Sequence, residues 1–398
     1  MKPVSFAAIA FALAVALVHA ALAQQPPAAN PALNAPDQVA WMLFLQANAD
    51  ASTPGNHDAT FETWPNDGDT FKPKPAARFT LRHQPLRLSP RALFVVHALP
   101  PGGAGEETHR NPAAYDFIVA NHLYSTRGLQ AAFGSTLSFP VDAVEVKANW
   151  YPVGNIPGYR GNPADAYKSY HVAKSSDGAT YALVSMHIIS KLVPNWTWAT
   201  FEHENNPARC DVMGCKDLFG AQVPYVPPNA SAAAGYGTCP QTGALQRLFA
   251  ATRIDPAFSH YCLKGTQTDF TDATGLAVRL ANSVIEEGFV PQSSCMTCHA
   301  RAAFDRTGRA TSPAGFDPNG NAFVGPVDPS WFWSFQSETP LAGAIGPGGQ
   351  STTPIVPNPS REPIRIATPA DFVWSIPFCA IDDTDAAHPQ PSRFCAAK

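Results

Sequence analysis

The stretch SSCMTCHARA, residues 293–302, constrains this chain more than any other. It holds two cysteines three positions apart, Cys295 and Cys298, with His299 directly after the second. Residues three apart share one face of a helix, so both sulfurs can bond one edge of a porphyrin while the imidazole that follows reaches its iron. The pattern C-x-x-C-H is the attachment signature of a c-type haem. We therefore expect one covalent haem c at Cys295 and Cys298, with His299 as an axial ligand of the iron.

Two other interpretations of the cysteine pair are weaker. A thioredoxin-like pair begins a helix directly after a strand, whereas a helical pattern precedes this one. The helix is predicted over 271–289, where apolar residues recur with helical spacing: Leu276, Val278, Leu280, Ala281 and Ile285. Half of a zinc site would need a second C-x-x-C or a spaced histidine pair, and the sequence supplies neither.

The first residues indicate export. One positive charge at Lys2, an apolar run over 6–18 and a small-residue box over 21–23 are typical of a secretory signal peptide, which we assign to residues 1–23. The apolar run is shorter than the ~20 residues that a spanning helix needs. Later stretches are not apolar enough to span a membrane either, so we expect a periplasmic or secreted protein without a membrane span after cleavage.

The cysteine count agrees with an oxidising compartment. Eight cysteines are present, and attachment of a haem would leave six, an even number. Sequential pairing is the simplest connectivity, because short loops close most easily. It would join the pairs Cys210 and Cys215, Cys239 and Cys262, and Cys379 and Cys395.

Composition bounds the partners and the fold. Lys and Arg number 27 against 31 Asp and Glu, with no concentrated basic patch, which excludes a nucleic-acid binder. A proline- and alanine-rich linker over 24–35 precedes a β-rich domain of unknown role over 36–270. A cytochrome c-like haem segment over 271–398 follows. The expected fold class is α+β, with a β-rich body and a C-terminal haem-bearing segment of short helices and long loops.

Periodicity predicts the elements of the body. Helices are expected over 36–48 and 111–124, the second with His122 on its apolar face as a core histidine. Alternation predicts a half-buried strand over 144–150 and a hairpin over 170–191, turned at residues 177–178. In the hairpin, Met186 should share a face with Val184 and Ile188, and His187 should lie on the other face. A further aromatic strand begins at residue 195, and loops are expected over 224–237 and 341–363.

The second axial ligand is not specified by a motif. Methionine is the usual second ligand in small c-type cytochromes, but none follows Met296, which lies inside the motif itself. A histidine would hold the potential low, a methionine would raise it, and an open position would admit small molecules. The remaining candidates are His388, His187, His203, His260 and Met213.

Two groups of polar residues have a structural and a functional interpretation. Arg301, Arg306 and Arg309 follow the motif and suit haem propionates or a rim for an acidic partner, and a solvated loop explains them equally well. Glu202, His203 and Glu204 suit an acid/base or metal site, but a polar loop end is favoured because no second ligand pair accompanies them.

The sequence also resembles a known group of proteins. The blocks TFETWPNDGDTF, VEVKANW, SMHIISKLVPNWTWATFEHENNP, ANSVIEEGFVPQSSCMTCHARA and FVWSIPF resemble secreted bacterial proteins described only as "cytochrome c family protein". The likeness spans about Trp41 to Cys379. It implies a covalent haem at Cys295 and Cys298 with His299 on the iron, and it implies no substrate. The late motif and the missing methionine depart from the ordinary small cytochrome.

Two main functions follow from these observations. The first is an electron carrier that works with a redox partner protein. The alternative is a haem enzyme, peroxidase- or oxygenase-like, or a small-ligand sensor with an open distal iron site. A structural or carbohydrate-binding β domain with an accessory haem is a third hypothesis.

Overall fold

The computed structural model describes residues 30–51, 57–88, 104–176, 178–228, 237–287, 290–311, 324–334, 362–392 and 395. The predicted signal peptide lies outside the described residues, as do the first part of the predicted linker and most of the predicted loop over 341–363.

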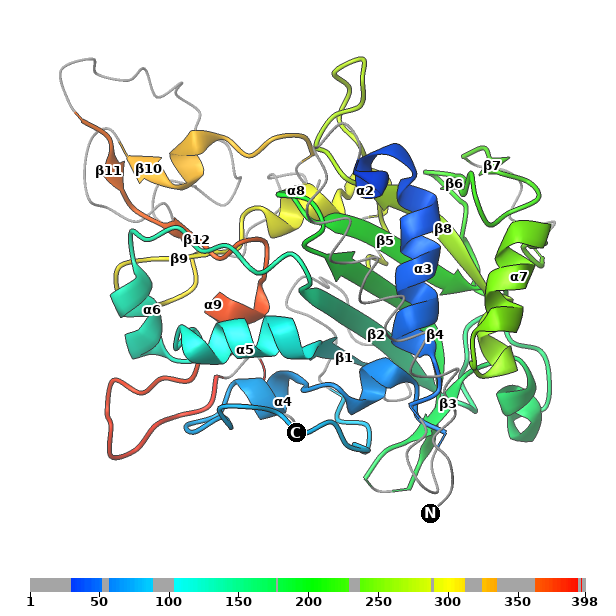
Figure 1. Ribbon diagram of the computed structural model, residues 1–398, viewed down its shortest axis with the longest axis horizontal. Coiled ribbons are helices and arrows are strands. Elements are labelled where there is room, and N and C mark those ends of the chain that lie inside the picture. The colour runs from blue at the N-terminus through cyan, green and yellow to red at the C-terminus, as the bar shows by residue number, and fades with distance from the viewer. Residues whose placement is uncertain are drawn as a thin grey trace.

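The fold class is α+β, as predicted. An antiparallel sheet of six strands has the order β1-β2-β4-β5-β8, with β3 paired to β4. Figure 1 shows these strands at the centre, with α3 lying across them. The helices, in chain order, are α2 (Pro31–Asn34), α3 (Pro36–Asn48), η2 (Thr60–Thr63), α4 (Asp67–Thr70), α5 (Pro112–Ala120), α6 (Thr126–Ala132), η3 (Pro163–Lys168), α7 (Gly243–Ala251), η5 (Pro256–His260), η6 (Val290–Gln292), α8 (Cys295–His299), η7 (Pro329–Trp331) and α9 (Ser375–Cys379). The strands are β1 (Gly105–Arg110), β2 (Val144–Pro152), β3 (Val172–Lys174), β4 (Thr180–Ser190), β5 (Thr197–His203), β6 (Cys215–Lys216), β7 (Tyr225–Val226), β8 (Tyr261–Gln267), β9 (Ala303–Phe304), β10 (Trp333–Ser334), β11 (Ile364–Arg365) and β12 (Thr368–Pro369).

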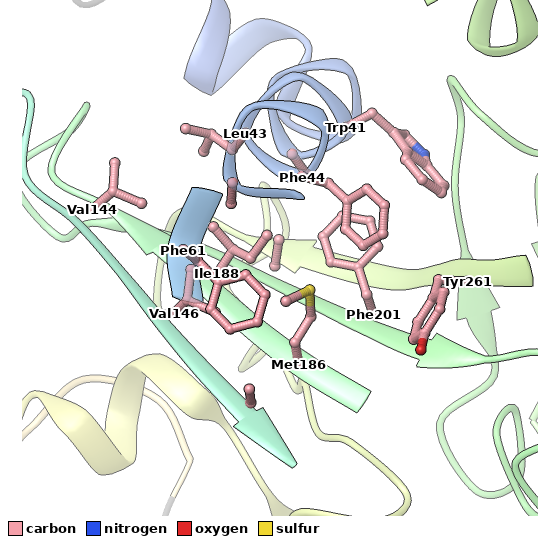
Figure 2. Packing of buried hydrophobic residues seen from close by; sticks show 14 of the residues in the cluster. Trp41, Leu43, Phe44, Phe61, Val144, Val146, Met186, Ile188, Phe201 and Tyr261 are labelled. Carbon is pink, nitrogen blue, oxygen red and sulfur yellow. The ribbon is translucent and has the colours of Figure 1, made fainter. Parts of the chain in front are cut away.

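One face of the sheet forms the main core beneath α3. Figure 2 shows the aromatic side chains of this helix meeting apolar side chains of β4 and β5. Trp41 and Phe44 both contact Phe201, with ring centroids 5.1 and 4.4 Å apart. The helix begins where predicted, with Pro36 in its first turn. Its buried surface is wide, because η2 and α7 also pack against it.

The strand over 144–150 is confirmed, but its half-buried character was wrong. Alternate apolar residues of β2 face α3, as expected, and most of the polar residues between them are buried too. Glu145 is buried and accepts a hydrogen bond from Arg110, 3.2 Å away. Packed segments therefore cover both faces of the sheet.

The hairpin of β3 and β4 is confirmed, with one correction to its faces, while residue 177 of its predicted turn lies outside the described residues. The pairing of β2 with β4 skips Val184, which forms a bulge. Leu183, rather than Val184, therefore packs with Met186 in the core beneath α3. After the bulge, residues 185–190 alternate as expected, and His187 lies on the face opposite Met186.

The helix predicted over 271–289 was wrong. Asp272 begins a tight turn instead, because its Oδ1 accepts hydrogen bonds from the backbone N–H groups of Thr274 and Leu276. Leu276 is 69% exposed. Farther on, Leu280 pairs with Ser294 as an isolated bridge, and residues 283–287 form turns.

Two smaller predictions also need correction. Residues 30–35, the end of the predicted linker, are folded: Asn30 caps α2 and donates a hydrogen bond to the carbonyl of Leu192, 3.0 Å away. His122 is not a core histidine. It follows the end of α5, has a φ of 56° and is exposed, because the helix ends at Ala120 before reaching it.

A second core joins the two regions that the sequence divided at residue 270. Trp198 and Ile189, from β5 and β4, pack in one apolar cluster with Met296 and Trp374 from the later region. The later region therefore covers the face of the sheet opposite α3, and the haem motif lies within this cover.

Candidate haem site

The C-x-x-C-H motif, residues 295–299, occupies a single helical turn, α8. Its start is fixed by Ser294, whose hydroxyl accepts a hydrogen bond from the backbone N–H of Thr297. Cys295 and Cys298 are half-buried, and they are the free cysteines of the described chain. The turn thus presents two thiols on one face and His299 immediately after them, as the sequence predicts.

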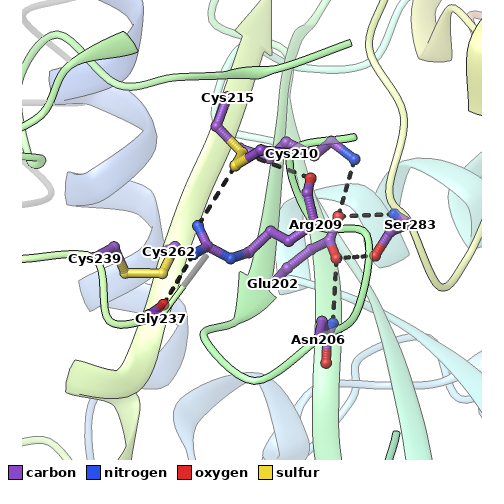
Figure 3. The surroundings of a disulfide bond; sticks show 10 residues. Glu202, Asn206, Arg209, Cys210, Cys215, Gly237, Cys239, Cys262 and Ser283 are labelled. Carbon is purple, nitrogen blue, oxygen red and sulfur yellow. Dashed lines mark hydrogen bonds and ion pairs between the residues drawn. A yellow bond between two sulfur atoms is a disulfide. The ribbon is translucent and has the colours of Figure 1, made fainter. Parts of the chain in front are cut away.

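The other six cysteines form three disulfides with the predicted sequential pairing. They join Cys210 to Cys215, Cys239 to Cys262, and Cys379 to Cys395. Figure 3 shows the first two on either side of the buried Arg209, which donates a hydrogen bond to the carbonyl of Gly237, 3.1 Å away. These two disulfides and Trp41 line a cavity of about 200 Å³ that lies apart from the haem motif.

His299 is held in the form that binds a metal. Its Nδ1–H donates to the carbonyl oxygen of Phe372, 2.8 Å away, which leaves the lone pair on Nε2. Burial lowers the pKa of His299 to about 4, so the ring is neutral. Phe372 and Asp371 have positive φ values of 71° and 47°, and Lys191 fixes this turn through an ion pair of 2.6 Å with Asp371.

The two thiols are not built as a redox nucleophile. Burial raises the pKa of Cys298, and it raises that of Cys295 well above its ordinary value. A catalytic C-x-x-C pair instead needs a lowered pKa on its attacking thiol. The Sγ–H of Cys295 donates to the carbonyl of Leu280 at 3.2 Å. The environment therefore argues against the thioredoxin-like interpretation.

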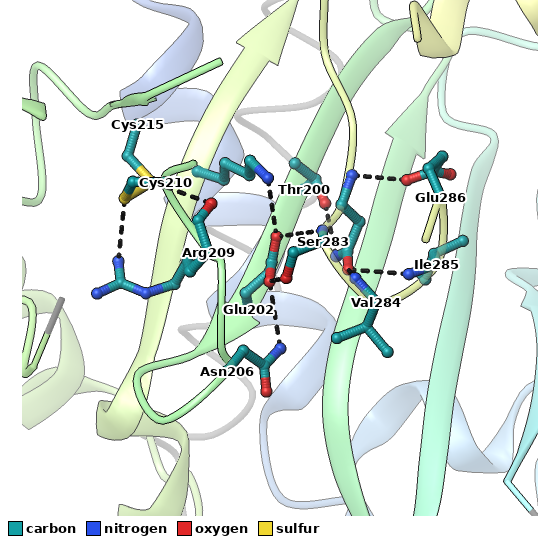
Figure 4. Close-up of polar contacts among 12 residues, drawn as sticks. Thr200, Glu202, Asn206, Arg209, Cys210, Cys215, Ser283, Val284, Ile285 and Glu286 are labelled. Carbon is teal, nitrogen blue, oxygen red and sulfur yellow. Dashed lines mark hydrogen bonds and ion pairs between the residues drawn. A yellow bond between two sulfur atoms is a disulfide. The ribbon is translucent and has the colours of Figure 1, made fainter. Parts of the chain in front are cut away.

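Alternate residues of β5 hold the segment that carries the motif. The ring of Trp198 lies 4.7 Å from that of His299, between centroids. Two residues on, the hydroxyl of Thr200 accepts a hydrogen bond from Asn282 Nδ2 at 2.9 Å. The next residue on this face, Glu202, accepts hydrogen bonds from the backbone N–H and the hydroxyl of Ser283. Figure 4 shows the hydrogen bonds of Thr200 and Glu202, which fix the segment before the motif against the sheet.

The polar cluster over 202–204 is a loop end only at Glu204, which lies in the turn after β5. Glu202 and His203 belong to β5 and are fully buried. Glu202 pairs with Lys264 at 3.2 Å, while His203 stacks on Tyr170 with centroids 3.5 Å apart. Burial lowers the pKa of His203 to about 3. The sequence contains a sign of this: Trp198, Thr200 and Glu202 are spaced two apart, as residues on one face of a strand are, so the strand can continue into the polar residues.

Among the sequence-derived candidates for the second axial position, His187 lies beside the motif. Its Nε2–H donates to Glu286 Oε1, 3.1 Å away, and it pairs across the sheet with Thr200, two residues from the Trp198 that contacts His299. The other three histidines are engaged elsewhere. His203 donates to the carbonyl of Ser169, His260 to Glu204, and the exposed His388 to Asp385. Met213 lies at the turn closed by the Cys210–Cys215 disulfide.

The arginines after the motif differ from one another. Arg306 and Arg309 are exposed, which suits a solvated loop. Arg301 is buried, its guanidinium lies 5.3 Å from the centroid of the Trp331 ring, and burial lowers its pKa to about 10. The solvated-loop interpretation is therefore wrong for Arg301.

A second group of possible metal ligands does not fit a metal. Asp67 lies within 4.8 Å of the sulfurs of Cys379 and Cys395. These sulfurs are joined in a disulfide and have no thiolate to offer. The motif, with two free thiols and a neutral imidazole, is the donor set that a c-type haem requires.

Comparisons with known proteins assign no family or function to the chain. None of the helices in the part of the chain that the structure describes is long and apolar enough to cross a membrane. No protein-family model matches the chain, and no match was found among curated proteins or solved structures.

Proposed function

We propose that this chain is a c-type cytochrome that transfers single electrons to or from a redox partner protein. Cys295 and Cys298 would hold the porphyrin through thioether bonds, and His299 would bind its iron. The haem supplies one-electron chemistry, and the protein supplies burial, ligation and a docking surface. The disulfides and the leader support a periplasmic or secreted location.

The geometry of the motif, with two free thiols and an oriented histidine, supports this proposal. Cys295 and Cys298 are free while the other six cysteines are paired, and they lie on one turn capped by Ser294. The carbonyl of Phe372 orients His299 with Nε2 unprotonated. A backbone carbonyl behind a ligating imidazole is the usual way to fix its tautomer and raise its basicity.

Intact-mass analysis tests the proposal directly. The chain, exported from a host with active cytochrome maturation, should carry the added mass of one haem that acid and organic solvent do not extract. The double variant Cys295→Ala/Cys298→Ala should lose this mass. His388→Ala, an exposed histidine far along the chain, should keep it.

Bare polypeptide from the matured wild type would overturn the proposal. A haem mass that survives in the double cysteine variant would also do so, because attachment would then involve other residues. Retention in single cysteine variants is compatible with it, since one thioether bond is sufficient to hold the porphyrin.

A further inference from the structure

Two histidines lie over the same part of the sheet. His187 of β4 is paired directly with Thr200 of β5, and Trp198 is two residues from Thr200 on the same face. Diagonal neighbours of this kind in an antiparallel pair lie roughly 7–8 Å apart. Trp198 in turn contacts the ring of His299. His187 is therefore one diagonal step from the side chain on which His299 packs.

One short segment connects His187 to the haem motif. Glu286 accepts the hydrogen bond from His187, and its other carboxylate oxygen accepts one from the backbone of Asn282 at 2.6 Å. Leu280, at the start of the segment, accepts a hydrogen bond from the backbone N–H of Cys295 at 3.2 Å. The position of His187 relative to the attachment site is thus fixed by the sheet on one side and by the segment 280–286 on the other.

Both imidazoles donate a hydrogen bond from one ring nitrogen to an oxygen acceptor. His299 has one N–H held by the carbonyl of Phe372, and His187 has one held by the carboxylate of Glu286. A neutral imidazole held in this way carries its lone pair on the second nitrogen, where it can bind a metal. The side chain of His187 is only 13% exposed, so water has little access to it. An oxygen acceptor behind an imidazole is the arrangement found around metal-ligating histidines.

We propose that His187 is the second axial ligand of the haem iron, with Glu286 as its positioning residue. This inference rests on the proposed function, since it requires an attached haem. It adds that the iron is six-coordinate and low-spin with two histidines, and that its potential is low. Such a site carries electrons and does not bind small molecules readily, which favours the carrier over the enzyme or sensor.

The wild type gives the first test. Its oxidised form should show the electron paramagnetic resonance signal of low-spin iron with two imidazoles, and its reduced form should not bind carbon monoxide rapidly. High-spin iron that takes carbon monoxide at once would overturn the inference and favour the open-site alternative. This measurement needs no variant, so a folding defect cannot obscure it.

Variants then identify the ligand. His187→Ala should convert the iron to high spin and admit carbon monoxide, and added imidazole should restore the low-spin spectrum. His187→Met should remain low-spin with a raised potential, because a thioether replaces an imidazole. His260→Ala is the matched control, since His260 also pairs with a glutamate, Glu204, but lies elsewhere. Its spectrum should not change.

The two proposals fail in distinguishable ways. Absence of a haem mass in the wild type contradicts the cytochrome itself. An attached haem that stays low-spin in His187→Ala, with circular dichroism showing a folded chain, contradicts only the assignment of His187.

Discussion

At the scale of single residues, one buried histidine, His171, is held between two carboxylates. His171 donates from Nε2 to Glu62 at 2.9 Å and from Nδ1 to Asp255 at 3.0 Å, so it joins β3, η2 and the residue before η5. Burial alone would lower its pKa, but the two carboxylates outweigh burial and raise the pKa to about 10. Burial alone would raise the pKa of Asp255, but its hydrogen bonds to His171 and the backbone of Ala257, together with the charge of His171, lower it. His171 is therefore an imidazolium at neutral pH.

The contacts of His171 with Glu62 and Asp255 predict how the free energy of unfolding depends on pH. The pKa of His171 is higher in the folded chain than its ordinary value of about 6.5, so the folded state binds the proton more tightly. Its contribution is fully present below pH 6.5 and is lost as pH rises toward 10. The free energy of unfolding should fall by up to about 1.4 kcal/mol per pH unit within this window.

Urea unfolding at several pH values measures this slope. His171→Gln should be less stable at neutral pH and should lose most of the slope above pH 6.5, whereas His388→Gln should retain it. An unchanged slope in His171→Gln would contradict the assignment.

A glycine next to the motif region provides a second prediction at this scale. Gly308 has a φ of 71°, and a Cβ placed there would lie 2.3 Å from the carbonyl oxygen of Thr126 in α6. Gly308→Ala should therefore lower the free energy of unfolding by about 1–3 kcal/mol through backbone strain, and by more through the clash. Gly134→Ala is the control, because its φ is 86° but no atom lies within 4 Å. Equal losses in the two variants, measured by urea unfolding, would show that the contact with Thr126 contributes nothing.

At the scale of elements, the sequence predicts what depends on local pattern and misses what depends on distant partners. The alternation in β2 and β4 predicts both strands, because a pleated strand repeats every two residues. It does not predict the bulge at Val184, which arises from pairing with β2. The helix expected over 271–289 is wrong because its local pattern is overridden. Its apolar spacing suits a helix, but Asp272 and the segment's contacts with β5 favour a turn and an extended chain.

A buried ion pair joins β5 to β8. Glu202 and Lys264 are both buried. Lys264 is the bulge residue of β8, because the pairing of β5 with β8 skips it. Glu202→Ala should lower the free energy of unfolding by about 3–5 kcal/mol, because it leaves an ammonium group buried without its partner.

The double variant Glu202→Gln/Lys264→Met should cost less than Glu202→Ala, since it removes both charges. Denaturant unfolding of the single and double variants would measure the difference. A double variant as unstable as Glu202→Ala would show that the bonds of Glu202 to Ser283, rather than its charge, dominate.

At the scale of the whole molecule, the C-x-x-C-H motif is visible in five letters of the sequence, whereas the residues around it come from distant parts of the chain. Trp198, Phe372 and Glu286 each contact the motif or His187, and they lie 101, 73 and 99 residues from the partners they touch. No local pattern could indicate these contacts. The division at residue 270 likewise followed composition and periodicity, and neither reveals that one apolar cluster spans it.

This shared cluster predicts that the β-rich region does not fold alone. A chain that ends at Phe270 would lack Met296 and Trp374 and would expose Trp198 and Ile189 to water. Because such large apolar patches are not tolerated on a stable monomer, the shortened chain should bind hydrophobic dyes and aggregate, and it should show no cooperative heat absorption. The full chain should unfold in one transition, with an enthalpy near 0.7 kcal/mol for each folded residue, by calorimetry. A cooperative transition in the shortened chain would show instead that β1–β8 and α3 form a self-sufficient domain, and that the haem segment is an addition to it.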